Sequence, residues 1–295
     1  DYTRMLMAAV PTLHLKERAN DPAAPVVLKV QGLHKTYATK GWFGAVRSVH
    51  AAKAVHFEIR RGQTLGIVGE SGSGKSTVAR CIVRLIDPSG GQVLLGGGGG
   101  GAGSAAPTDI ATMPAGLLRP LRKRVQIVFQ DPYRSLNPRR TVAQAMVEGP
   151  MNYGLGHAAA LARARELLAL VRMDASALDR YPHQFSGGQR QRICIARALM
   201  MEPELLVADE AVSALDVSVQ AQVLQLFEDI RVRLNLAMLF ITHDLRVASQ
   251  VCDHLAVMML DLRNTNALLF KNAGTGKHNM VYRRGDGSIG WVEPS

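Results

Sequence analysis

The sequence from residue 69 to residue 77 reads Gly69-Glu70-Ser71-Gly72-Ser73-Gly74-Lys75-Ser76-Thr77. This run fits the phosphate-binding pattern G-x-x-x-x-G-K-[ST] without a mismatch. The apolar run at residues 64–68 predicts a buried strand before it. Helical spacing of apolar residues over 78–86 predicts a helix after it, which Asp87-Pro88 ends. A strand, a glycine turn and a helix are the context this pattern needs, so a plain Gly/Ser loop is the weaker interpretation.

Each residue type in the run has a physical role in holding phosphate. Glycines let backbone N–H groups turn inward around phosphate oxygens, where any side chain would collide. The N-terminus of the following helix adds partial positive charge. We expect Lys75 to reach the β- and γ-phosphates of a nucleotide and Ser76 to hold Mg²⁺ through its hydroxyl.

The composition is that of an ordered protein. Hydrophobic residues make up 47% of the 295 residues, which is enough for the core of one large domain or two small ones. Cys81, Cys194 and Cys252 stand far apart in apolar segments, which predicts buried thiols in a reducing compartment and not a disulfide or metal set. No apolar run approaches the roughly 18 residues that span a bilayer.

The formal net charge of +11 has two interpretations. One is a nucleic acid partner. The other is phosphate handling together with a surface near an anionic membrane face. Aromatic residues are only 5% of the chain and most Arg and Lys residues are scattered, so no base-stacking platform is visible. We favour the second interpretation and expect no nucleic acid partner.

Strands and helices alternate along the chain, which predicts an α/β sheet with its site at the carboxyl ends of the strands. The predicted strands cover residues 26–30, 55–59, 64–68, 92–95, 125–129, 204–208 and 237–241. The predicted helices cover residues 78–86, 141–173, 193–200 and 217–234. The glycine run 96–101 predicts an irregular surface loop.

Polar residues follow three of the predicted strands. Asp209 closes one of them, where a second Mg²⁺-binding acid is expected in this class of NTPase. The side chain of the adjacent Glu210 should point away from Asp209, so that it can polarise water as a general base. Gln130 and His243 follow two other strands, and each alone would be an ordinary polar residue.

A second anion site is predicted at Ser186-Gly187-Gly188-Gln189, where a Ser-Gly-Gly turn opens a helix. One chain with two such sites suggests that one of them serves a neighbouring subunit.

Together these motifs resemble those of the ATP-binding subunit of an ABC transporter. Residues 69–77 are similar to the family's Walker A loop, residues 205–210 to its Walker B strand, and Ser186 to Gln189 to its signature. Phe185 stands where Leu is commoner, and Ala211 where the family usually has Pro. The motifs occur in the family's order and at family-like spacing, so the resemblance is highly specific.

Four further positions match functional residues of the family. Gln130 corresponds to the Q-loop and His243 to the switch histidine. Ser213-Ala214-Leu215-Asp216 is similar to the D-loop, and Tyr37 to the aromatic residue that stacks on adenine. The resemblance covers about residues 26–259.

The resemblance implies a P-loop NTPase (RecA-like) α/β core with an antiparallel β subdomain near the N-terminus. A helical subdomain is expected as an insertion at about residues 131–192. Two such units would sandwich two ATP molecules head to tail, so that each ATP meets Lys75 of one unit and Ser186 to Gly188 of the other.

The same resemblance implies in-line attack of water on the γ-phosphorus of ATP. Ser76, Gln130 and Asp209 would hold Mg²⁺. Lys75 would offset developing charge, Glu210 would orient the water and His243 would contact the γ-phosphate.

A finer resemblance links residues 129–138 and 214–222 to the ATPases of oligopeptide and dipeptide importers. It implies ATP-driven uptake of peptides, or of a related solute such as nickel chelates. Expected partners are permease subunits and, indirectly, a periplasmic solute-binding protein, with the ATPase at the cytoplasmic face of the inner membrane. The ATPase does not touch the solute, so its sequence does not specify it.

The two ends depart from the pattern. Residues 1–25 form a lead segment, in which residues 2–11 are similar to a piece that normally closes this subfamily's ATPase domain. This favours a tandem protein with two ATPase halves over a chance Ala/Leu-rich helix. The expected partner unit in the ATP sandwich is either the other half of such a tandem chain or a separate ATPase subunit. The ABC domain is expected over residues 26–260.

The atypical tail covers residues 261–295, where residues 280–292 predict a β-hairpin. A frameshifted or recombined end and a functional appendage are equal alternatives for it. Two other functions stay open for the whole chain: a soluble ABC-type ATPase of DNA repair or translation, and a degenerate module that binds nucleotide without hydrolysis.

Overall fold

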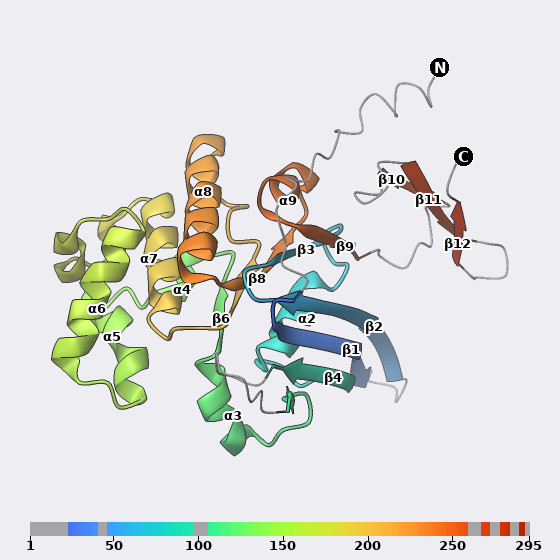
Figure 1. Ribbon diagram of the computed structural model, residues 1–295, viewed down its shortest axis with the longest axis horizontal. Coiled ribbons are helices and arrows are strands. Elements are labelled where there is room, and N and C mark those ends of the chain that lie inside the picture. Colours follow the sequence, from blue (N-terminus) through green and yellow to red (C-terminus); the bar gives the residue numbers. More distant parts are fainter. Residues whose placement is uncertain are drawn as a thin grey trace.

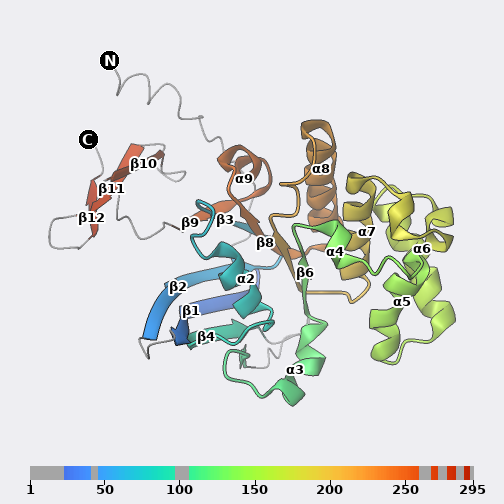
Figure 2. The ribbon, with the colours of Figure 1, turned by 180° about the vertical axis from the view of Figure 1, so that it is seen from behind.

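The computed structural model describes residues 23–40, 46–96, 106–258, 267–271, 278–283 and 289–292. A five-stranded sheet lies at the centre, with a group of helices on one side and an antiparallel sheet on the other (Figure 1). The same arrangement is seen from behind (Figure 2). The lead segment up to residue 22 and the glycine run from residue 97 lie outside the described residues.

The central sheet is parallel throughout and has the strand order β6-β7-β8-β3-β9. Its strands are β3 Thr64–Val68, β6 Val125–Val128, β7 Leu205–Asp209, β8 Ala237–Thr242 and β9 His254–Val257. Strands β3, β7 and β8 are buried along their whole length, as expected for unbroken apolar runs in a sheet covered on both faces. Strand β9 was not predicted.

The two faces of this sheet belong to two apolar cores. In β8, Met238 and Phe240 pack into a core shared with the helices. Leu239 and Ile241, which alternate with them, pack into a second core under the antiparallel sheet. This alternation follows from the two-residue period of a strand.

The antiparallel sheet has the strand order β2-β1-β4-β5. Its strands are β1 Val26–Lys40, β2 Val46–Arg60, β4 Gly90–Leu95 and β5 Thr108–Asp109. Strands β1 and β2 are longer than predicted because they pair with each other over most of their length. Helix α2 Lys75–Ile82 packs into the same core as this sheet.

Helix α2 also differs from its prediction. It begins at Lys75, directly after Gly74, and ends at Ile82 instead of residue 86. Arg84 has a left-handed backbone (φ 54°), which a continuing right-handed helix cannot contain. The Arg84 side chain donates hydrogen bonds to the carbonyls of Ile110 and Met113, which hold this turn in place.

The helical group covers the edge of the central sheet beside β6 (Figures 1 and 2). The α-helices after α2 are α3 Ala115–Arg122, α4 Pro132–Ser135, α5 Val142–Asn152, α6 His157–Leu170, α7 Gly187–Leu199, α8 Val217–Leu234 and α9 Leu245–Val251. Two 3₁₀ turns, Ala175–Asp179 and Pro182–Gln184, precede α7. Helix α8 has the predicted bounds, and helix α7 begins at Gly187, after the Ser186 cap, where the Ser-Gly-Gly turn was predicted to open a helix.

A separate three-stranded antiparallel sheet is formed by β10 Ala267–Lys271, β11 His278–Arg283 and β12 Ile289–Val292. The predicted hairpin is present as β11 and β12, which pair Val281 with Trp291. Strand β10 was not predicted.

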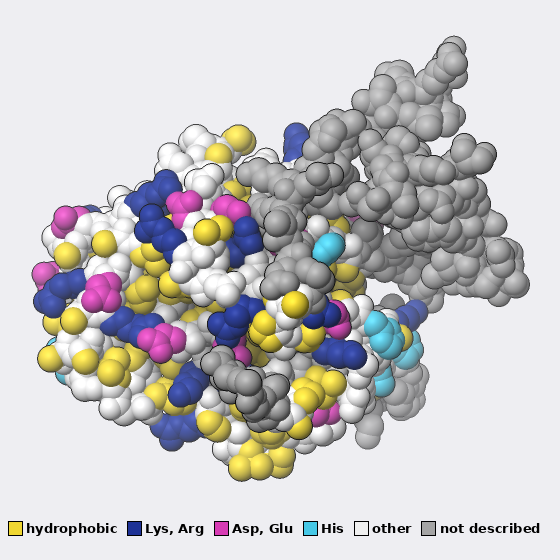
Figure 3. Space-filling view, in the orientation of Figure 1, with side chains coloured by type: hydrophobic (Ala, Val, Ile, Leu, Met, Phe, Trp, Pro, Cys, Tyr) yellow, Lys and Arg dark blue, Asp and Glu magenta, His cyan; other side chains and the backbone are white. Residues whose placement is uncertain are grey.

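All three cysteines are buried, as expected. Within the described ranges, no helix has the length and apolar character required to cross a membrane. On the face drawn in Figure 3, Lys and Arg side chains are interspersed with acidic and apolar ones.

Candidate functional site

The phosphate loop joins β3 to α2, as predicted. Gly72 and Gly74 have left-handed backbones (φ 86° and 92°), which glycine adopts without strain. A Cβ built on Gly74 would lie 1.7 Å from the carbonyl oxygen of Ala51, so only glycine fits there. Lys75 is 3% exposed, and its Nζ donates hydrogen bonds to the carbonyls of Gly69 (2.8 Å) and Glu70 (2.7 Å).

One hydroxyl in the loop has no partner. The Ser73 Oγ is buried and makes no hydrogen bond within the described part of the chain. A buried hydroxyl without a partner is unfavourable, and an oxygen of a bound phosphate would supply an acceptor. The Ser73 hydroxyl and the Lys75 ammonium are therefore two hydrogen-bond donors that could bind an anion in the loop.

Ser76 and Asp209 meet at the base of the site. The Ser76 Oγ donates a hydrogen bond to Asp209 Oδ1 over 2.7 Å, although 133 residues separate them in sequence. The Asp209 carboxyl is buried, which raises its pKa above the ordinary value, and the hydrogen bond from Ser76 partly opposes that rise. A hydroxyl beside a carboxylate is an oxygen donor pair of the kind that Mg²⁺ prefers.

Glu210 points to the other side of the strand end, toward two basic side chains. Its Oε1 lies 3.9 Å from Lys75 Nζ, and its Oε2 lies 3.6 Å from His243 Nδ1. The Glu210 backbone is left-handed (φ 49°) and its N–H donates to the Ile241 carbonyl over 2.9 Å. Asp209 and Glu210 therefore face different partners.

Register explains why these side chains meet. In the parallel ladder Asp209 pairs with Ile241, and Val68 pairs with Thr242. The carboxyl ends of β3, β7 and β8 are therefore level. The phosphate loop, Glu210 and His243 directly follow these ends, so they lie at the same end of the sheet. This is the location that the α/β pattern predicted.

Gln130 reaches this end of the sheet through Ser213. The Gln130 amide donates to Ser213 Oγ (3.2 Å), and that hydroxyl donates to the Glu210 carbonyl (2.9 Å). Ser213 belongs to the run that is similar to the D-loop, but the sequence predicts no separate role for it. Its position between Gln130 and Glu210 depends on a contact over 83 residues, which no local pattern reveals.

The second predicted anion site is the N-terminus of α7. Ser186 and Gln189 form a capping box, in which the Gln189 N–H donates to Ser186 Oγ and the Ser186 N–H donates to Gln189 Oε1. Gly188 packs so closely on α8 that a Cβ there would lie 2.3 Å from Val219. Among the described residues, no hydrogen bond or ion pair joins residues 186–189 to the phosphate loop.

The remaining predicted residues lie at exposed positions. Tyr37, on β1, is 43% exposed, and the Lys35 ammonium lies 5.0 Å from the centre of its ring. Asp216 caps α8 by accepting hydrogen bonds from the Val219 N–H and the Ser218 hydroxyl, which lower the pKa of its carboxyl. No hydrogen bond or ion pair between described residues connects Tyr37 or Asp216 to Lys75.

Comparison with known proteins identifies the family. The ABC transporter family model matches residues 52–213, which is more than half of the chain. This chain belongs to the ABC transporter family. This membership and the MJ0796 cassette structures confirm the predictions of an α/β ABC ATPase fold and of ATP hydrolysis.

Relatives of this ABC protein are import ATP-binding proteins by name. A putative peptide import ATP-binding protein of Brucella ovis is 46% identical over 235 residues, or 79% of this chain and 69% of that protein. The glutathione import ATP-binding protein GsiA of Salmonella typhimurium is 42% identical over 286 residues, or 88% of this chain and 44% of that protein.

Solved structures of bacterial ABC cassettes have the same fold. The dimeric structure of the bacterial cassette MJ0796 aligns with a TM-score of 0.65 at 26% identity, covering 79% of this chain and 94% of that one. MJ0796 bound to ADP and Pi, in a post-hydrolysis state, gives a TM-score of 0.66 at 26% identity, with 78% and 94% covered.

A second family model matches the end of this ABC protein. It is described as Sigma 54 modulation/S30EA ribosomal protein C terminus and covers residues 254–290. The match lies where the ABC resemblance stops, and it is too short to show a family.

Proposed function

We propose that this chain powers an ABC importer for peptides or a related solute. The names of its relatives support the class of solute. The observation that carries the ATPase part is that Ser76 meets Asp209 and Lys75 meets Glu210 where β3 and β7 end, through contacts over long sequence separations. Assembly with permease subunits at the cytoplasmic face of a membrane, supplied by a solute-binding protein, follows from the same proposal.

ATP would bind with its phosphates in the loop. The hydrogen bonds of Lys75 to two loop carbonyls hold its ammonium where charged phosphate oxygens would be stronger acceptors. The hydroxyl of Ser76 and the carboxylate of Asp209 would hold Mg²⁺, with Gln130 as a further oxygen donor. When bound, Mg²⁺ supplies positive charge that offsets charge on the phosphates.

Glu210 would act as the general base for the attacking water. Its carboxylate lies between Lys75 Nζ, 3.9 Å away, and His243 Nδ1, 3.6 Å away. His243 is 54% exposed on its side chain, so it is open to the γ-phosphate of a bound nucleotide. Glu210 would accept a proton from the attacking water and His243 would help to orient the γ-phosphate, while Lys75 would stabilise charge in the transition state.

A second unit would complete each site through its signature run. Residues 186–189 present a helix N-terminus that, among the described residues, makes no hydrogen bond to the phosphate loop of its own chain, and MJ0796 forms a dimer. The second unit would be another ATPase subunit or the other half of a tandem protein. The tandem alternative is supported by GsiA, in which the matched region is 44% of the length.

The import function can be tested by reconstitution with the permease subunits of the same organism in lipid nanodiscs. We expect copurification of this chain with the permease, and ATP turnover that rises when a peptide-loaded binding protein is added. The control is the same binding protein without peptide. Turnover that responds to DNA ends or ribosomes, and not to the permease, would favour the soluble DNA-repair or translation alternative.

We predict that Tyr37→Ala weakens ATP binding by about fivefold, because base stacking on an aromatic ring contributes ~1 kcal/mol. The exposed ring makes such stacking possible. Fluorescence titration with ATP measures the Kd, and Tyr37→Phe is the matched control that keeps the ring. Equal ATP affinity in the Ala variant and the parent would exclude Tyr37 from the adenine site.

A further inference from the structure

Helix α4, which follows Gln130 after one residue, lies against α7, which begins at the signature run. The Tyr133 ring of α4 stacks on the Arg190 guanidinium of α7, with 3.8 Å from the Arg190 Cζ to the centre of the ring. Tyr133 is 62% exposed, whereas Arg190 is only 7% exposed. The ring therefore covers a cation that is otherwise inside the protein.

Arg190 is fixed in direction by its other contacts. Its Nε donates to the Pro182 carbonyl over 2.6 Å and its Nη2 donates to the His183 carbonyl over 3.3 Å. Its Nη1 is buried and has no hydrogen-bond partner in the described part of the chain. An aromatic face is the remaining group that stabilises such a guanidinium. Arg190 thus connects Tyr133 to the turn that leads into Ser186.

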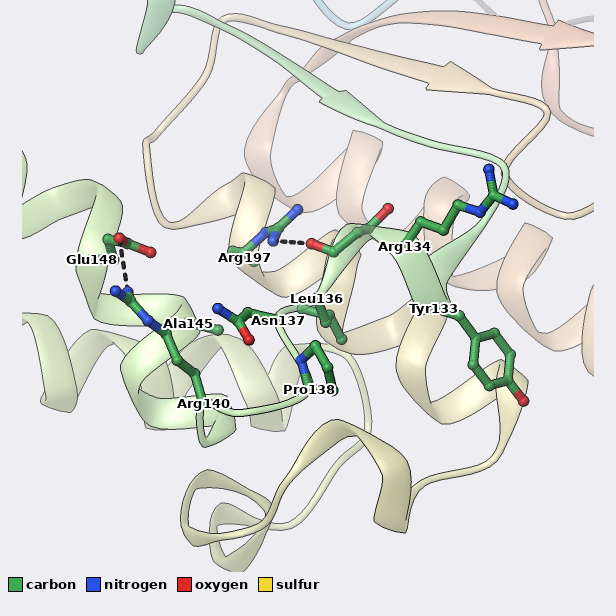
Figure 4. A pocket seen from close by; sticks show the side chains of 10 residues that line it. Tyr133, Arg134, Leu136, Asn137, Pro138, Arg140, Ala145, Glu148 and Arg197 are labelled. Carbon is green, nitrogen blue, oxygen red and sulfur yellow. Dashed lines mark hydrogen bonds and ion pairs between the residues drawn. The ribbon is translucent and has the colours of Figure 1, made fainter.

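A second contact joins the same two helices. Arg197, about two turns further along α7, donates a hydrogen bond to the Ser135 carbonyl at the end of α4. At its start, α4 is capped by Asp131, which accepts from the Tyr133 and Arg134 N–H groups. Tyr133 and Arg197 both line a pocket of about 530 Å³ that borders this contact (Figure 4).

We propose that Tyr133 and Arg190 are positioning residues that attach the Q-loop to the signature helix, so that Gln130 and Ser186 move as one unit when ATP is bound. Arg190 contacts Tyr133 near the start of α4 and Arg197 bonds the Ser135 carbonyl at its end, so a shift of α4 relative to α7 would break both contacts. The proposal rests on the proposed function, in which the signature run of one unit completes the ATP site of another. Neither residue contacts ATP in this arrangement.

The test replaces Tyr133 with Leu, which removes the aromatic face, and with Phe, which keeps it. For Tyr133→Leu we expect kcat to fall by about threefold to tenfold, which lies between the energy of an exposed and that of a desolvated cation–π contact, because Tyr133 is exposed and Arg190 is buried. The Kd for ATP should stay within about twofold of the parent, because the loop donors are untouched. Tyr133→Phe should retain the parent kcat.

Three results would overturn the proposal: an unchanged kcat in Tyr133→Leu, an equal loss in Tyr133→Phe, or a large loss of ATP affinity. Thermal melting checks that the Leu variant is folded, which the exposure of Tyr133 leads us to expect.

A second measurement separates this inference from the proposed function. In a Glu210→Gln background, size-exclusion chromatography with ATP measures pairing of units, and adding Tyr133→Leu should raise the ATP concentration needed for pairing. Pairing that is unaffected by Tyr133→Leu contradicts the inference alone. Absence of pairing in Glu210→Gln itself contradicts the head-to-tail arrangement, and the inference with it.

Discussion

Glu210→Gln is expected to lower ATP turnover by about 100-fold or more, because a positioned general base contributes at least that factor. ATP binding should remain close to that of the parent. Gln has the same length as Glu and keeps the left-handed backbone of this position, so the loop geometry is preserved. The change removes the negative charge that lies between Lys75 and His243 and replaces one acceptor oxygen with an NH2 donor. Steady-state phosphate release measures the effect, and titration with ATP measures binding.

A matched control for this variant is Glu166→Gln, which removes a carboxylate from an exposed position of α6 and should turn over ATP like the parent. The Glu210→Gln protein should also accumulate as an ATP-bound dimer in size-exclusion chromatography, since ATP is bound and not hydrolysed. Normal turnover in this variant would remove Glu210 from the role of base.

The left-handed backbone of Glu210 also favours a functional role for this residue. A non-glycine residue with φ near +49° carries strain of roughly 1 kcal/mol or more, which the surrounding structure must hold. The hydrogen bond from the Glu210 N–H to Ile241 and the one from Ser213 to the Glu210 carbonyl restrain both sides of this residue. Backbone strain of this kind is common at functional sites, where the direction of a side chain is maintained at some cost in folding stability.

The central sheet could be predicted from the sequence because its signal is local. Strand β3 has the predicted bounds, since an unbroken apolar run between turn residues has few other structures available. The bounds of α8 were likewise predicted, from an amphipathic pattern over 217–234, whereas its cap at Asp216 is seen only in the structure. The short elements α9 and β9 were missed, because neither is long enough for a period to emerge.

The site shows the same division between local and distant signals. The phosphate loop, Asp209 and Glu210 could be named because each lies in a motif next to a strand. The bond from Gln130 to Ser213 and the stack of Tyr133 on Arg190 could not, because they join residues that are far apart in sequence. Only the packing of α4 on α7 brings the second pair together.

The second large effect is expected for Gly74→Ala, which should destabilise the fold as well as remove the phosphate site. A Cβ at Gly74 would lie 1.7 Å from the Ala51 carbonyl oxygen, which is backbone and cannot rotate away. The next residue, Ala52, is paired with Lys35 in the antiparallel sheet, so a shift of Ala51 would disturb that pairing. The left-handed backbone of Gly74 adds strain for any side chain.

Gly72→Ala separates these two causes. Gly72 has nearly the same left-handed backbone as Gly74, but a Cβ there meets no atom within 4 Å. We expect Gly72→Ala to lower the free energy of unfolding by about 1 to 2 kcal/mol, from strain alone. Gly74→Ala should lose roughly 1 to 3 kcal/mol more through overpacking, a large share of the 5–15 kcal/mol typical of a domain. Urea unfolding monitored by circular dichroism measures both values. Equal losses of unfolding free energy in the two variants would show that a Cβ at Gly74 does not collide with the Ala51 carbonyl oxygen.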